Sequence, residues 1–95
     1  MKPHKLDHAT NGWNLAIYDN GGRSTDRYTV IFKDCPEGRG LFQCLGMNAF
    51  PFHPQGIGMH SSAMPGRHLG RRITFDNLPK DCQRAVEQDC KEPRE

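Results

Sequence analysis

The strongest pattern in this 95-residue sequence lies near its C-terminal end, and it is helical. Asn77 is suited to cap a first turn, and Pro79 fits that turn because its missing N–H is not needed there. Apolar residues then recur along one helical face, at Leu78, Cys82, Ala85, Val86 and Cys90. The spacing predicts an amphipathic helix of about three turns, whose apolar face must pack against another element.

The remainder of the chain carries patterns typical of β-strands. Residues 13–18 alternate between two faces, and residues 27–33 are rich in β-branched and aromatic side chains. An Asp-Asn-Gly-Gly turn separates these two segments, and further strands are predicted at 41–47 and 71–75. We therefore expect an α+β fold, in which a small antiparallel sheet of three to four strands carries the C-terminal helix.

A chain of this length is expected to form one domain. We assign residues 1–11 to a flexible N-terminal arm, residues 12–91 to a single α+β domain and residues 92–95 to a tail. Residues 48–66 contain three prolines and three glycines, and they are predicted to form one long loop. A loop of this length in a compact domain is usually functional.

Charge is distributed unevenly along the chain. The net charge is only +2, yet no Asp or Glu lies between Glu37 and Asp76, where the chain has four arginines and three histidines. The positive field is therefore local, and it coincides with the long predicted loop. We expect the binding residues there: Phe52, His53, Gln55, Met59, His60, Arg67, His68, Arg71 and Arg72.

The sequence carries no catalytic or metal-binding motif. The histidines at 53, 60 and 68 do not have the paired spacing of zinc ligands, and no serine lies in a nucleophile elbow. We predict no catalytic residue, no metal and no cofactor, with Cys44 and Cys82 acting as small core residues. An enzyme or metal protein that uses His53, His60 and Cys35 stays open as an alternative.

The expected location is the cytoplasm. No hydrophobic run follows Met1, and no segment approaches ~20 apolar residues, so neither a signal peptide nor a membrane contact is predicted. The four cysteines are then expected to be reduced thiols.

Four motifs occur in order along the chain. They are Asp-Asn-Gly-Gly with Asp-Arg-Tyr-Thr-Val, then Pro-Phe-His-Pro-Gln-Gly, then Gly-Arg-His-Leu-Gly-Arg-Arg-Ile, and finally Leu-Pro, within residues 17–86. In this order they resemble a group of small uncharacterised proteins encoded by phages, other mobile elements and bacterial genomes. The resemblance implies a bacterial host and a self-contained domain, and it transfers no residue roles.

The first functional hypothesis is a non-enzymatic protein-binding protein. It would dock a protein partner in a bacterial host, such as a defence complex, through the acid-free segment. It would act as an inhibitor or accessory factor of host machinery, with anti-defence activity of the anti-CRISPR kind as one form. The resemblance supports this role by association only. In the competing structural interpretation, Phe52, Ile57 and Met59 simply cover the open face of the sheet.

The second hypothesis is a protein that binds nucleic acid or a nucleotide. Arg67, Arg71 and His68 would hold phosphate, while an aromatic side chain at Trp13, Tyr28 or Phe52 would stack on a base. Adjacent arginines on a strand point to opposite faces, so only one of Arg71 and Arg72 could join a common patch. No oligomeric state is predicted.

Overall fold

The computed structural model describes residues 14–23, 26–54, 56 and 58–91. The predicted arm at 1–11 and tail at 92–95 lie outside these residues. The elements in chain order are β1 (Leu15–Asp19), β2 (Tyr28–Gly38), β3 (Leu41–Met47), β4 (Gly58–Ala63), the 3-10 helix η1 (Arg67–Leu69), β5 (Arg71–Ile73), the 3-10 helix η2 (Phe75–Asn77) and the helix α2 (Lys80–Lys91).

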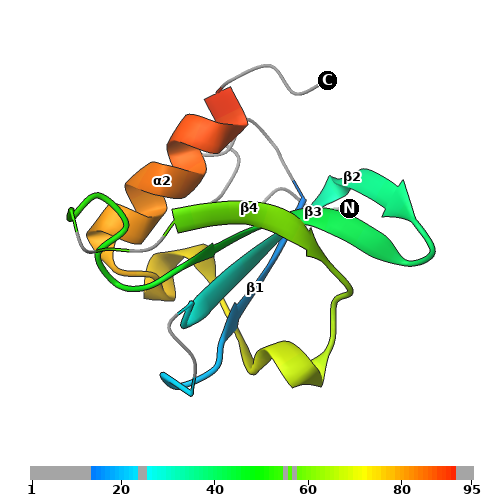
Figure 1. Cartoon of the computed structure of the whole chain (residues 1–95), viewed down its shortest axis with the longest axis horizontal. Helices are drawn as coiled ribbons and strands as arrows, with labels where there is room; N and C mark the ends of the chain where they lie inside the picture. The colour runs from blue at the N-terminus through cyan, green and yellow to red at the C-terminus, as the bar shows by residue number, and fades with distance from the viewer. Residues whose placement is uncertain (1–13, 24–25, 55, 57, 92–95) are drawn as a thin grey trace.

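The predicted α+β fold is confirmed. The five strands form one sheet in the order β4-β3-β2-β1-β5, and every neighbouring pair is antiparallel. Helix α2 lies on one side of this sheet (Figure 1). The strands β4 and β5 are its two edges, so the last two strands flank the meander formed by the first three.

The main core lies between the sheet and α2. Alternate residues of each central strand point into it, as strand geometry requires. The predicted helical stripe supplies the other side, with Cys82 and Val86 fully buried and Ala85 at the margin. The buried residues of this core are Leu15, Ile17, Tyr28, Val30, Phe32, Leu45, Met47, Phe75, Leu78, Cys82, Val86 and Cys90.

A second, smaller core lies on the opposite face of the sheet. Ala16, Tyr18, Ile31 and Cys44 are buried there, and Leu69 of η1 packs against them. Residues 15–18 thus alternate between the two cores, as the sequence predicts.

The predicted long loop at 48–66 is wrong over residues 58–63, which form the edge strand β4. None of these six residues is buried, so β4 lacks the apolar alternation that marks a half-buried strand. The sheet accordingly has five strands rather than three or four. Strand β2 also runs to Gly38, five residues beyond the predicted strand segment at 27–33. Irregular pairing around Pro36 accommodates the proline, which has no N–H to donate.

Two of the sequence motifs meet at one end of β1. The guanidinium of Arg27 donates to both carboxylate oxygens of Asp19, at 2.8 and 3.1 Å. These bonds hold the pKa of Asp19 below its usual value. Gly70 packs against the same point, because a Cβ on it would lie 2.4 Å from the carbonyl oxygen of Asp19. The residues Asp19, Arg27 and Gly70 therefore fix how β5 joins the sheet.

Candidate functional site

The connection between β3 and β4 is held by its own backbone. The segment of residues 48–56, which we call the 48–56 loop, contains two successive turns. His53 N donates to the carbonyl of Phe50 at 3.1 Å, and Gly56 N donates to the carbonyl of His53 at 2.8 Å. Only glycine fits at position 56, since a Cβ there would lie 1.6 Å from the Phe50 carbonyl oxygen. The side chain of Asn48 accepts a further bond from Phe50 N at 2.9 Å.

Helix α2 contacts the 48–56 loop at two points. The guanidinium carbon of Arg84 lies 5.0 Å from the centre of the Phe52 ring, within the range of a cation–π contact. Two residues earlier on the helix, the thiol of Cys82 donates to the Asn48 carbonyl at 3.1 Å. The loop is therefore anchored at two points to an element that is itself packed on the sheet.

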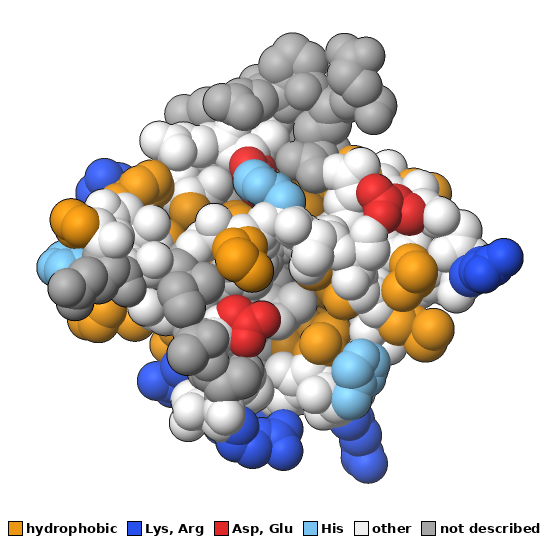
Figure 2. Space-filling view, viewed as in Figure 1, with side chains coloured by type: hydrophobic (Ala, Val, Ile, Leu, Met, Phe, Trp, Pro, Cys, Tyr) orange, Lys and Arg blue, Asp and Glu red, His pale blue; other side chains and the backbone are white. Residues whose placement is uncertain are grey.

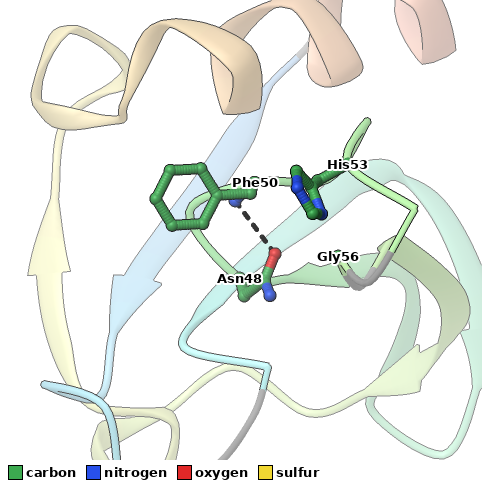
Figure 3. Close-up of a pocket in the computed structure, with 4 residues that line it drawn as sticks. All are labelled: Asn48, Phe50, His53 and Gly56. Atoms are coloured by element: carbon green, nitrogen blue, oxygen red, sulfur yellow. Dashed lines mark hydrogen bonds between the residues drawn. The ribbon is translucent and has the colours of Figure 1, made fainter.

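The 48–56 loop borders an open hollow of about 350 Å³. Figure 3 shows how the chain curls so that Asn48, Phe50, His53 and Gly56 surround it. Phe50 is 62% exposed, which makes it the most exposed large hydrophobic side chain in the described part of the chain. An aromatic ring beside a concave surface is a common anchor in protein recognition.

The exposed large hydrophobic side chains are concentrated in one stretch of sequence. Among the described residues they are Phe50, Phe52, Met59 and Met64, and all lie within 15 positions of one another. In Figure 2, hydrophobic side chains appear at several separate places on the face of the molecule that carries β4. The structure thus leaves Phe52 and Met59 exposed, whereas the competing structural interpretation has them cover the sheet. Ile57 lies outside the described residues.

Three consecutive side chains of β4 reach back to the body of the protein. His60 Nε2 lies 2.7 Å from Oδ2 of Asp89 on α2. Ser61 Oγ lies 3.3 Å from Sγ of Cys44 on β3, and the hydroxyl of Ser62 donates to Glu37 on β2. The strand is therefore fixed to three different elements, and no described strand pairs with its outer edge.

The predicted arginines do not form one patch. Arg72 lies over the ring of Tyr18, at 5.7 Å from its centre, and donates to the Leu15 carbonyl at 3.4 Å. Arg71 is opposite Asp19 in the pairing of β5 with β1, on the other face of the sheet from its neighbour. Arg67 and His68 are exposed in η1. Gln55 and Trp13, which were also candidates for binding, lie outside the described residues.

The cysteines do not form a reactive site. None of the four forms a disulfide, and Cys44, Cys82 and Cys90 are buried. Burial raises the pKa of Cys82 to about 11, so its thiol is protonated at neutral pH and is a poor nucleophile. Within residues 14–91, apart from the four that are not described, no three His, Cys, Asp or Glu side chains are grouped to hold a metal ion. In the same residues, no helix is long and apolar enough to cross a membrane.

Sequence reasoning missed two parts of this site. Phe50 is absent from the predicted binding residues, although its place beside Pro51 in a Gly/Pro-rich segment was a usable signal. The contact between His60 and Asp89 joins residues 29 positions apart, and no local pattern signals it.

No protein-family model, curated protein or solved structure matches this chain. Its function is therefore inferred from the exposed side chains and the contacts described above.

Proposed function

We propose that this is a non-enzymatic binding protein that docks another protein through the 48–56 loop. The observation that carries the proposal is the exposure of Phe50 beside a hollow. The loop that lines this hollow is held by its own turns and by contacts with α2. Two backbone turns, the glycine at position 56, and the contacts of Arg84 and Cys82 support the described residues of the loop. A surface that is already ordered loses less conformational entropy on binding, so more of the contact energy appears as affinity.

The chemistry of the loop suits an apolar side chain of a partner. Phe50 and Phe52 provide aromatic area, and aromatic residues are enriched where interfaces are most buried. The loop has no carboxylate, and His53 is exposed on it, so a neutral or acidic partner surface would meet no negative charge there. We infer a protein partner that inserts an apolar side chain into the hollow and surrounds it with polar contacts.

The proposed setting is the cytoplasm of a bacterial host, with the protein encoded by a phage or another mobile element. There it would act as an inhibitor or accessory factor of host machinery, with a defence complex as the foremost target. The order of the four motifs supports this setting by resemblance, and the exposed loop supports the binding role by its geometry.

Nucleic-acid binding has less support. Its phosphate contacts are limited to Arg67, Arg71 and His68, because Arg72 lies over Tyr18 on the other face of the sheet from Arg71. An affinity for nucleic acid that falls steeply with salt would favour this alternative over protein binding.

The proposal is tested by comparative capture from a bacterial host lysate with three forms of the protein, followed by mass spectrometry. The forms are the wild type, Phe50→Ala and Met64→Ala. Met64 is the matched control, because it is also an exposed apolar side chain but lies beyond β4. We expect one protein to be enriched by the wild type and by Met64→Ala, and to be lost with Phe50→Ala. Captured proteins that are the same for all three forms would argue against the loop as the binding surface.

A further inference from the structure

The strand β4 is an open sheet edge of unusual composition. It pairs with β3 on one side, and no other described strand pairs with its outer side. Alternate N–H and C=O groups of such a strand point outward and are available to another strand. Natural edges are usually protected by charged residues, by proline or by being short. β4 has six residues without Lys, Arg, Asp, Glu or Pro, whereas the opposite edge, β5, has three residues of which two are arginines.

The side chains of β4 leave this outer edge uncovered. His60, Ser61 and Ser62 are directed toward Asp89, Cys44 and Glu37, which belong to elements on the inner side of the strand. These contacts also hold β4 in an extended conformation before any partner arrives, so pairing would require little ordering. Among the described residues, the outer edge is therefore unpaired, and it is already extended.

We propose that two copies of this chain pair antiparallel through β4, about a two-fold axis that passes through Ser61. Directly opposed residues of antiparallel strands lie on the same face of the sheet, so a symmetric pair must be centred on a residue rather than between two residues. An axis at Ser61 sets Met59 opposite Ala63 and His60 opposite Ser62. The result is one continuous sheet with both copies of α2 on the same side.

The exposed methionines favour a second copy of this chain as the partner of β4, and they favour pairing about Ser61. Met59 lies near the start of β4 and Met64 directly follows its end, and both are about half exposed or more. Antiparallel self-pairing brings the start of one strand to the end of the other, so Met59 of each copy meets Ala63 of the second copy, and Met64 falls opposite Gly58. Centring the pair on His60 would set Met59 opposite the polar Ser61 instead. The neutral edge also brings no like charges together.

This inference goes beyond the proposed function and does not depend on it. The dimer would use the edge of β4, while the 48–56 loop would contact a different protein. The following experiments use the purified chain alone, so their failure leaves the proposed function untouched.

The first experiment measures the mass of the full chain by sedimentation equilibrium from micromolar to millimolar concentration. We expect a reversible transition from the 10.8 kDa chain to twice that mass. Ser61→Lys should weaken association at least about tenfold, because it sets two positive charges directly opposite each other. Asn14→Lys adds the same charge beside β1, away from the edge, and should leave association unchanged. A wild type that stays monomeric throughout, or a Ser61→Lys variant that dimerises as the wild type does, overturns the proposal.

The second experiment tests the register and needs no substitution. In a mixture of two differently isotope-labelled wild-type samples, intermolecular NOEs should link the Met59 and Ala63 methyl groups. A dimer without these NOEs would contradict the proposed pairing. This measurement decides the question even where circular dichroism shows that Ser61→Lys does not fold.

Discussion

The imidazole of His60 and the carboxylate of Asp89 lie 2.7 Å apart, and this contact ties the edge strand β4 to α2. His60 is more than half exposed, so the pair should contribute less than about 1 kcal/mol to global stability. Its effect should be local. We predict that Asp89→Asn increases the hydrogen exchange of the β4 amides and leaves the amides of β1 unchanged.

The control is Asp81→Asn, which removes an exposed carboxylate on the same helix that bonds to Arg84. It should not alter exchange in β4. Equal effects of the two variants on β4 would show that the contact with His60 does not hold the edge strand.

The bond between Arg27 and Asp19 predicts a specific pH dependence. Arg27 holds the pKa of Asp19 below its ordinary value of 3.8, so the stabilisation is fully present above that pH. It is lost as the pH falls through the lower folded-state value, because the unfolded chain then binds the proton more readily. Arg27→Gln should lower the free energy of unfolding at neutral pH, because it removes both hydrogen bonds to the ionised Asp19 carboxylate.

Urea denaturation at neutral pH and at about pH 3 checks this prediction, since the difference between wild type and variant should shrink at the lower pH. Arg23→Gln serves as the control for loss of one positive charge in the same turn. A difference between wild type and Arg27→Gln that does not change with pH would contradict the assigned role of Asp19.

Gly70 should be far more sensitive to substitution than Gly22. Both have positive φ, at 116° and 91°, so alanine is strained at either position. At Gly22 a Cβ meets nothing within 4 Å, whereas at Gly70 it would lie 2.4 Å from the Asp19 carbonyl oxygen. We expect Gly70→Ala to cost about 2–4 kcal/mol and Gly22→Ala about 1 kcal/mol in thermal unfolding. Similar costs would mean that β5 does not pack on Asp19 as described.

The cysteines should differ in their reactivity toward an alkylating reagent under native conditions. Cys35 is half-buried, whereas Cys44, Cys82 and Cys90 are buried, and burial also raises the pKa of Cys82 to about 11. We predict that Cys35 is labelled first and that Cys82 is labelled only as the whole chain unfolds. Peptide mass spectrometry over a time course measures the order. Early labelling of Cys82 would contradict the packing of α2 on the sheet.

The central part of the fold was predictable because its apolar residues recur at the spacing of a strand or of a helix. Leu15 and Ile17 alternate as a strand does, and Cys82, Val86 and Cys90 recur as one face of a helix does, so local periodicity marks both sides of the main core. Strand β3 was also predicted with its observed bounds.

The edge of the sheet was not predictable in this way. β4 is exposed along its length, so its sequence carries no apolar period, and its glycine and flanking prolines suggest a loop. The candidate site depends on contacts between distant segments, such as Phe52 with Arg84 and Cys82 with Asn48, which only the folded chain brings together. By contrast, strand geometry alone predicted that the side chains of Arg71 and Arg72 point to opposite faces of the sheet.

The most direct test of the protein-binding proposal is the affinity of the captured partner for three purified forms, measured by titration calorimetry. A central aromatic anchor should account for much of the binding energy, so Phe50→Ala should weaken affinity at least about tenfold, while Met64→Ala should change it by less than about threefold. Affinities that are the same for the wild type, Phe50→Ala and Met64→Ala would contradict the assignment of the 48–56 loop as the docking surface.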